Sequence, residues 1–327
     1  MKRAGSSFDA ADAAMLVVVV VWAANNLVVK GALAELEPLA YVAGRFAIVV
    51  ALLFGWMAAT QRIAPPTAAD LPRFLFAGLF GYAAYNSLFT FGLARTSVFS
   101  VALLVSFGPI FTLLLAALLR MDRVRLGQWA GVALATAGVA LFETAKSRAA
   151  GAYDPSGDLL SLLAAFLFAA YSLASRPLVG RYGAAPATAW SVLIGLVCIL
   201  PVAWPSVQRQ NWATLSFRSW AELFYASAIS MLAGYTLWTW AIDRRGAART
   251  APYLFLIPIV TGALAALLFG ERLGPFELAG AACVFAGTAV VRLAAGRPAV
   301  HLDDAAMLVD GDPVRAAAEP IRPANAP

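Results

Sequence analysis

The sequence Pro109-Ile110-Phe111-Thr112 has a close counterpart in Pro258-Ile259-Val260-Thr261, at the same point of a second stretch of membrane length. A gapless alignment of residues 94–142 with residues 243–291 brings the two prolines together. Roughly a third of the aligned positions are identical, which predicts an internal repeat. The other informative pairs are Asp122-Arg123 with Glu271-Arg272, Gly131 with Gly280, and Gly138 with Gly287.

Each proline falls inside an apolar segment that we expect to be helical. Within a helix, proline removes one main-chain hydrogen bond and frees the carbonyl four residues earlier, here that of Val105 or Leu254. Lipid cannot satisfy such a carbonyl, so the break must face other helices or a water-filled cavity. Interrupted helices at corresponding points of two repeats are typical of a transporter's central site. We therefore predict that Pro109 and Pro258 are hinges; the alternative is a kink that serves only packing.

The composition places the whole chain in a bilayer. Hydrophobic residues make up 61% of it, charged residues make up 13%, and the mean hydropathy is +0.77. A water-soluble domain carries about 25% charged residues, and a membrane-spanning helix needs about 20 mainly apolar ones. Ten such segments are predicted, at residues 11–31, 38–58, 73–93, 97–119, 126–143, 157–177, 184–204, 219–241, 249–269 and 275–294.

The predicted fold is an all-α polytopic membrane protein with ten transmembrane helices in two five-helix repeats, residues 11–143 and 157–295. Because five is odd, the second repeat must be inverted relative to the first, as alternating access between two faces requires. The last residues, 296–327, are rich in Ala, Pro, Asp and Arg without an apolar period, and are predicted to be a disordered cytoplasmic tail.

The distribution of charge predicts the orientation. The side of the membrane that carries both termini has about twice as many Lys and Arg residues as the opposite side. Both termini are therefore predicted to be cytoplasmic. The net charge of +6 might suggest a nucleic-acid partner, but the basic residues cluster in short loops beside the spans. A membrane orientation signal explains them, and no nucleic-acid partner is expected.

Polar residues inside the first two spans are candidates for contact with a solute. Asn25 and Asn26 lie in the first span, and Arg45 lies about two turns into the second. A cation at that depth is costly and is by default a functional hypothesis. The alternatives are that Arg45 extends to the interface or bonds structurally to helix-end carbonyls.

Aromatic and polar stripes in three further spans are candidates for the walls of a pathway. Aromatic faces accept the apolar part of a solute, and hydroxyls and amides orient it. Helix packing and interfacial aromatic belts are the alternative explanation. The predicted lining residues are Tyr82, Tyr85 and Asn86 in the third span, Tyr171 and Ser172 in the sixth, and Tyr235 and Trp238 in the eighth.

Several classes of site are disfavoured by the residues that are missing. No Asp or Glu falls near the middle of a predicted span, and the single histidine, His301, is in the tail. The sequence has no phosphate loop, metal-ligand cluster or Ser-His-Asp pattern. Cys198 and Cys283 both fall inside predicted spans, where they are expected to be small buried residues. We therefore predict no enzyme activity, no cofactor and no metal ion.

The chain resembles the two-EamA-domain proteins of the drug/metabolite transporter superfamily across residues 11–295. The residues that carry the resemblance are the run from Trp22 to Lys30, Arg45-Phe46, Pro109, Asp122-Arg123, Pro258, Gly270-Glu271-Arg272 and Gly280. The chain departs from the family pattern at Ala23, where glycine is usual, and at Asp122, where glutamate is usual. Ser191 lies near where a repeat of Arg45 would fall.

The resemblance implies a bacterial inner-membrane carrier, often an exporter of amino acids or other small metabolites. The prediction is thus a secondary transporter that moves a small organic metabolite by alternating access, with a small-molecule substrate and the lipid bilayer as its partners. Arg45 would attract a carboxylate. The alternatives are a carrier for a drug or nucleotide sugar, or a membrane scaffold or receptor that transports nothing.

Overall fold

The computed structural model describes residues 10–60, 65–120, 124–149, 154–245 and 251–294. Every regular element in these ranges is a helix. The N-terminal half contains α1 (Ala10–Ala32), α2 (Pro38–Ala59), α3 (Leu71–Phe76), the π-helix η1 (Ala77–Ala84), α4 (Tyr85–Arg95), α5 (Val98–Val105), α6 (Gly108–Leu118) and α7 (Leu126–Ala149).

The C-terminal half begins after residue 153. It contains α8 (Ser156–Ala174), α9 (Arg176–Tyr182), α10 (Ala184–Arg209), the 3-10 helix η2 (Trp212–Thr214), α11 (Phe217–Phe224), the π-helix η3 (Tyr225–Ala233), α12 (Gly234–Arg245), the 3-10 helix η4 (Ala251–Phe255), α14 (Leu256–Phe269) and α15 (Pro275–Ala294).

Eight helical stretches are long and apolar enough to cross a membrane. They are Ala10–Ala32, Pro38–Ala59, Leu71–Arg95, Val98–Leu118, Leu126–Arg148, Ser156–Ala174, Ala184–Arg209 and Pro275–Ala294. Each corresponds to one of the ten predicted spans. The predicted span at 249–269 is represented by the shorter apolar stretch Tyr253–Phe269. The predicted span at 219–241 is helical through α11, η3 and α12, but it is not among the eight.

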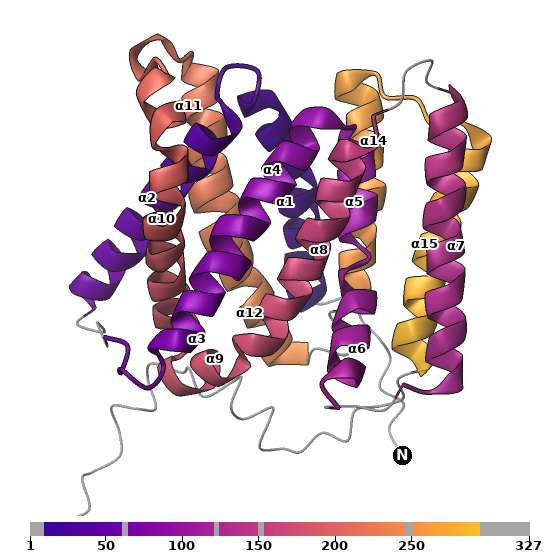
Figure 1. Cartoon of the computed structure of the whole chain (residues 1–327), viewed down its shortest axis with the longest axis horizontal. Coiled ribbons are helices and arrows are strands. Elements are labelled where there is room, and N and C mark those ends of the chain that lie inside the picture. The colour runs from indigo at the N-terminus through magenta and orange to yellow at the C-terminus, as the bar shows by residue number, and fades with distance from the viewer. Residues whose placement is uncertain (1–9, 61–64, 121–123, 150–153, 246–250, 295–327) are drawn as a thin grey trace, which may run out of the picture.

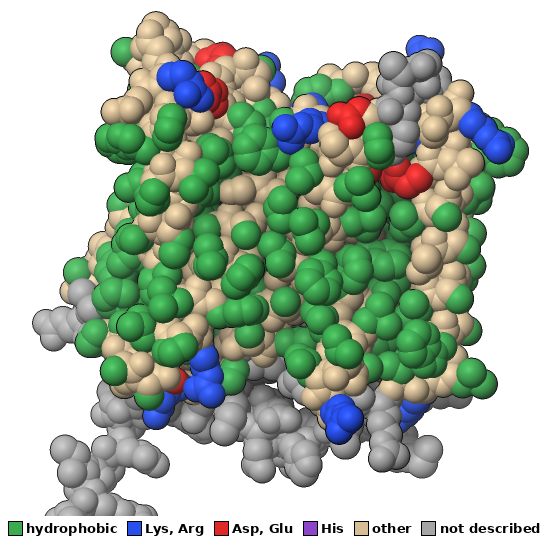
Figure 2. Space-filling view, viewed as in Figure 1, with side chains coloured by type: hydrophobic (Ala, Val, Ile, Leu, Met, Phe, Trp, Pro, Cys, Tyr) green, Lys and Arg blue, Asp and Glu red, His purple; other side chains and the backbone are tan. Residues whose placement is uncertain are grey.

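The surface of the bundle confirms that it is built for lipid. Hydrophobic side chains cover the middle of the face shown in Figure 2, and Lys, Arg, Asp and Glu lie near its upper and lower edges. Large apolar side chains such as Leu126 and Leu267 are 87% and 80% exposed. Such a belt is unfavourable in water and favourable in a bilayer, so the protein is a multi-pass membrane protein.

The spanning helices lie side by side, with α7 and α15 forming a pair at one edge of the bundle (Figure 1). Their contact depends on glycine. A methyl group on Gly131 would lie 2.7 Å from the carbonyl oxygen of Gly287, so only a residue without a side chain allows the two backbones to approach so closely. Small residues commonly form such contacts between membrane helices because close packing replaces the hydrophobic effect there.

Contacts among helix ends define the two ends of the bundle. The hydroxyl of Tyr253 donates to Asp12 over 2.7 Å, and the Arg292 guanidinium stacks on the Phe255 ring at 4.6 Å. The start of α1 and the end of α15 therefore lie at the same end, the lower one in Figure 1. Lys30 and the start of α5 lie at the upper end.

Candidate functional site

Two π-helices occupy corresponding positions of the two halves. The alignment that pairs Pro109 with Pro258 also pairs η1, residues 77–84, with residues 226–233, and η3 covers residues 225–233. A π-helix is rare, disturbs the regular main-chain bonding and is frequently found at functional sites. Sequence reasoning did not find either segment, because no residue type specifies a π-helix.

Main-chain carbonyls of η3 accept hydrogen bonds from side chains of the N-terminal half. The indole of Trp22 in α1 donates to the carbonyl of Ser230 over 3.1 Å. The Nη2 of Arg45 in α2 donates to the carbonyl of Ala226 over 3.1 Å. The irregular segment thus joins the halves at depth. Arg45 was predicted to be at the site; Trp22 was missed, although it shares a helical face with Asn26.

The carbonyls of η1 are satisfied differently, by side chains of the same spanning segment. The Asn86 amide donates to the carbonyl of Tyr82 over 3.0 Å, and the Ser87 hydroxyl donates to the carbonyl of Ala83 over 2.7 Å. Asn86 is buried, and its amide nitrogen is engaged locally. The two halves are therefore related in backbone shape and different in chemistry.

Arg45 is a buried cation with spare bonding capacity. Its side chain is only 8% exposed, and its Nε has no hydrogen-bond partner among the described residues. The hydroxyl of Tyr41, one turn earlier in α2, is likewise buried and without a partner in the described ranges. A buried guanidinium with an unbonded N–H, one helical turn from an unbonded phenol, is suited to binding a carboxylate.

Two predicted pathway tyrosines contact each other. The hydroxyls of Tyr82 and Tyr171 are 3.0 Å apart, within hydrogen-bond distance. The ring of Tyr85 lies 5.2 Å from that of Phe168, which belongs to the same helix as Tyr171. These contacts join η1 and α4 to α8 across the two halves. Ser172, also predicted here, donates to the carbonyl of Phe168 in its own helix.

The first-span amides are placed at a second contact between the halves. Asn26 donates from Nδ2 to the hydroxyl of Thr261 in α14 over 3.2 Å. The Oδ1 of Asn25 is buried and has no partner among the residues described here. The ring of Trp238 packs on that of Trp22 at 5.8 Å. The side chain of Tyr235 lies outside what the structure describes.

The two predicted hinge prolines begin helices, whereas the sequence suggested that they interrupt them. Pro109 is the second residue of α6, after a break that separates it from α5. Pro258 is the third residue of α14, which follows the 3-10 helix η4. Proline is favoured in a first helical turn, because its missing N–H would be unbonded there in any case. The hinge role itself stays a prediction.

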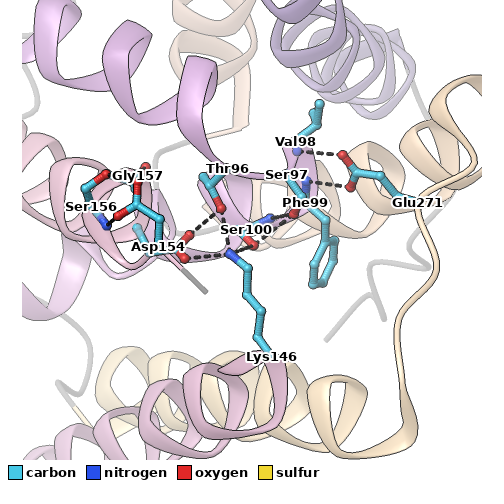
Figure 3. Close-up of polar contacts among 12 residues, drawn as sticks. Thr96, Ser97, Val98, Phe99, Ser100, Lys146, Asp154, Ser156, Gly157 and Glu271 are labelled. Carbon is cyan, nitrogen blue, oxygen red and sulfur yellow. Dashed lines mark hydrogen bonds and ion pairs between the residues drawn. The ribbon is translucent and has the colours of Figure 1, made fainter. Parts of the chain in front are cut away.

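A polar network at the upper end was missed by sequence reasoning. Lys146 in α7 forms an ion pair with Asp158 in α8 over 2.5 Å and donates to the hydroxyls of Thr96 and Ser100 (Figure 3). Both charged side chains are largely buried. The sequence carried one signal for it, since the oppositely charged Lys146 and Asp158 lie on either side of the connection between the halves.

Glu271 adds a second contact to this region. Its carboxylate accepts from the main-chain N–H groups of Val98, over 2.7 Å, and Phe99, over 3.2 Å (Figure 3). A carboxylate is favourable at a helix N-terminus, where N–H groups lack intrahelical partners. The Glu271-Arg272 pair of the repeat thus holds α5 of the other half in place.

At the lower end, Asp70 joins α3 to α9. It accepts hydrogen bonds from Tyr182, Arg181 and Thr67. The Tyr182 hydroxyl and the Arg181 guanidinium favour the ionised carboxylate and lower the pKa of Asp70 from 3.8 to about 2. At the upper end, Glu37 pairs with Arg209 over 3.0 Å, which lowers the pKa of Glu37. Each end therefore has a charged contact between the halves.

A cavity of about 480 Å³ opens at the upper end between the two halves. It is lined by Lys30, Gly31, Leu33, Ala34, Glu35, Ala94, Arg218, Ser219, Glu222 and Phe269. Within the described parts of the chain, no group of three or more His, Cys, Asp or Glu residues could hold a metal ion. Cys198 and Cys283 are free thiols. The polar groups between the halves suit recognition of a polar solute.

Comparison with known proteins identifies the chain's relatives. The EamA-like transporter family matches residues 10–144 and again residues 155–293. A "Probable amino-acid metabolite efflux pump" of Salmonella typhimurium is 30% identical over 83% of this chain and 91% of its own length. A "Probable terminal-alkyne amino-acid exporter" of Streptantibioticus cattleyicolor is 30% identical over 69% of this chain and 74% of its own.

A solved crystal structure shares the fold. It superimposes with a TM-score of 0.58 at 19% sequence identity and covers 89% of this chain and 100% of its own. At that identity the likeness shows the fold alone.

Proposed function

Since the chain belongs to the EamA-like transporter family, we propose that it exports small organic metabolites, with amino acids as the substrate class, by alternating access. The family is one of membrane transporters, so the chain is a transporter and not an enzyme. The names of two relatives, an amino-acid metabolite efflux pump and an amino-acid exporter, support the substrate class.

The proposed architecture is ten transmembrane helices in two inverted five-helix repeats. Support comes from the reciprocal contact of α7 and α15: Gly131 meets Gly287, and Gly138 meets Gly280. In the repeat alignment Gly131 corresponds to Gly280 and Gly138 to Gly287, so each glycine of α7 contacts the counterpart of the other glycine of α7. This crossed pairing is expected of two related helices that run in opposite directions. The matching π-helices η1 and η3 support the same relation.

The proposed setting is a bacterial inner membrane, with the lower end of Figure 1 in the cytoplasm and the upper end outside. The excess of Lys and Arg in loops on the side of the termini supports this orientation. The upper cavity then opens to the outside.

The observation that carries the substrate proposal is the environment of Arg45. Its guanidinium is buried and bonded to the carbonyl of Ala226 in the other half, and its Nε has no partner among the described residues. The Tyr41 hydroxyl, one helical turn earlier, also has no partner there, so the site offers an incomplete shell of bonds. A substrate carboxylate would complete it with charge-assisted hydrogen bonds. Tyr82, Tyr171 and Trp238 would contact the rest of the solute. Pro109 and Pro258, each at a helix start beside a break, would allow bending between the two open states.

The proposal is tested with the purified full chain in liposomes loaded with single labelled solutes. We expect amino acids to leave these liposomes faster than protein-free ones, and cationic drugs and nucleotide sugars to leave at the background rate. Arg45→Ala is expected to reduce amino-acid efflux by about tenfold or more, since it removes one partner of a buried charge contact. Arg148→Ala is the matched control, because Arg148 is exposed at the end of α7.

Two results would overturn the proposal. Flux of a drug or nucleotide sugar without amino-acid flux would assign the protein to another substrate class. Unchanged amino-acid efflux by Arg45→Ala would remove Arg45 from the pathway.

A further inference from the structure

The cavity at the upper end lies between helices of both halves. Its walls come from the ends of α1 and α4 in the N-terminal half and from α11 and the end of α14 in the C-terminal half. Figure 2 shows this end of the molecule indented, with acidic and basic side chains on both sides of the indentation. A volume of about 480 Å³ accommodates a small metabolite.

Lys30 and Arg218 are the basic residues that line the cavity, and Arg218 is paired with Glu222. The Lys30 ammonium donates to the main-chain carbonyls of Leu93, over 2.6 Å, and Thr96, over 3.0 Å. These acceptors are neutral carbonyl groups, and they fix its position. An ammonium has three N–H donors, so one remains for a ligand. Over the described ranges, Lys30 forms no ion pair with a carboxylate within 4.0 Å.

Glu222 of α11 supplies the negative charge. Its Oε1 accepts from Arg218, whose side chain is 75% exposed, so this is a weak surface ion pair. Its Oε2 is buried and has no hydrogen-bond partner in the described part of the chain. A buried carboxylate oxygen without a donor is unfavourable, and a ligand that donates to it is correspondingly favoured.

Lys30 and Glu222 line the same cavity, and their helices touch. A methyl group on Gly31, the residue after Lys30, would be 2.5 Å from Glu222 Oε1, so the carboxylate rests directly on the end of α1. Leu33, Ala34 and Phe269 add apolar surface to the same cavity. A ligand that matches all three features carries a carboxylate, an ammonium and an apolar side chain. An amine or a carboxylic acid alone would satisfy only one wall.

The cavity also adjoins the deeper site. Ala226, whose carbonyl binds Arg45, follows Glu222 by one helical turn. The cavity wall and the carbonyl that binds Arg45 therefore lie on consecutive turns of one helical segment, α11 and η3.

We infer that the upper cavity is an exit site for a zwitterionic α-amino acid, in which Lys30 binds the carboxylate and Glu222 binds the ammonium. The inference rests on the proposed function and names the recognition of both charged groups of the substrate. The carboxylate of Glu222 and the third N–H of Lys30 are the groups that the ligand would engage.

The test measures binding of four related ligands to the full chain in lipid nanodiscs. The ligands are L-leucine, leucinamide without the carboxylate, 4-methylpentanoate without the ammonium, and 3-methylbutylamine as a second amine. Wild-type protein is expected to bind L-leucine about tenfold or more tightly than each of the others, because each lacks one charge-assisted contact.

The variants separate the two roles. Lys30→Met should weaken L-leucine binding about tenfold and leave leucinamide binding unchanged, since the amide never engaged the lysine charge. Glu222→Gln should weaken L-leucine binding and leave 4-methylpentanoate binding unchanged. Arg148→Gln and Asp154→Asn, charged positions of the same end outside the cavity, should keep the wild-type order.

A second measurement leaves both charges intact. In a chain with Cys198→Ala and Cys283→Ala, the exposed cavity residue is replaced as Ala94→Cys and labelled with a membrane-impermeant maleimide. L-leucine at saturation should slow labelling, and leucinamide or 4-methylpentanoate at the same concentration should not. This assay decides the matter if either charge variant fails to fold.

The outcomes distinguish the two proposals. If L-leucine is transported, while it neither protects Ala94→Cys nor binds more weakly to the two charge variants, the exit site is wrong and amino-acid export stands. If the wild-type chain neither binds nor transports amino acids, both proposals fall.

Discussion

Gly138 of α7 lies so close to Gly280 of α15 that a methyl group on Gly138 would be 2.7 Å from the carbonyl oxygen of Gly280. The same methyl group would lie 2.6 Å from the main-chain nitrogen of Val284. Both neighbours are backbone atoms, which cannot turn aside as a side chain can. The contact between α7 and α15, the last helices of the two halves, therefore requires glycine at this position.

We expect Gly138→Ala to lower the free energy of unfolding by about 1–3 kcal/mol through overpacking at this seam. Gly55→Ala in α2 is the matched control, because nothing lies within 4 Å of the added methyl group. It should be neutral or stabilising by up to about 1 kcal/mol, since alanine is the better helix former. Thermal unfolding in detergent measures both, and a shift of the same sign and size in the two variants would refute the steric explanation.

The hydrogen bond between Asn26 and Thr261 provides a second prediction. Thr261→Val keeps the shape and removes the acceptor for the Asn26 amide. We expect a loss of about 0.6 kcal/mol, and at most about 1.7, as for interhelical hydrogen bonds in membranes. Thr112→Val is the control, since the Thr112 hydroxyl bonds to Gly108 in its own helix. The explanation fails if the control loses as much stability as Thr261→Val.

The Lys146–Asp158 ion pair provides a third. Lys146→Met removes one partner of a pair whose carboxylate is only 3% exposed, and is expected to cost about 3–5 kcal/mol. The double variant Lys146→Met with Asp158→Leu removes the buried charge as well and should recover most of the loss. Denaturation of all three variants, including Asp158→Leu, completes a double-mutant cycle. Additive effects of the two substitutions would show that the residues do not interact.

Asp70 provides a pH prediction. Its pKa is lowered to about 2, so the ionised form stabilises the folded protein at any pH above the ordinary carboxyl value of 3.8. That stabilisation is lost as the pH falls from about 4 through about 2, because over this range the unfolded state takes up a proton that the folded state does not yet bind. The difference in melting temperature between wild type and Asp70→Asn should be constant above about pH 5 and shrink below pH 4.

Tyr182→Phe refines this measurement. The Tyr182 hydroxyl is the leading cause of the lowered pKa of Asp70. Its removal should raise the folded-state pKa, so that the acid loss becomes smaller and is complete at a higher pH. A profile identical to that of the wild type would show that the hydroxyl does not stabilise the carboxylate.

The sequence determined the class of the fold, because long apolar runs have only one stable form in lipid. A main chain in a bilayer must satisfy its own hydrogen bonds, and a helix does so within each segment. Eight predicted spans are thus present as membrane-length helices. The repeat could also be read directly, since Pro109 and Pro258 stand at equal spacing from Gly131 and Gly280.

Only the tertiary structure decided how these helices recognise one another. The bonds from Trp22 to Ser230 and from Arg45 to Ala226 join residues 208 and 181 positions apart. Their acceptors are main-chain carbonyls, which every residue carries, so no side-chain pattern could mark them. Lys30 and Glu222 likewise came to line one cavity only once α11 had packed on the end of α1. The sequence of each segment determines which side chains it can bury in lipid or protein. The packing of the helices determines which polar groups come into contact.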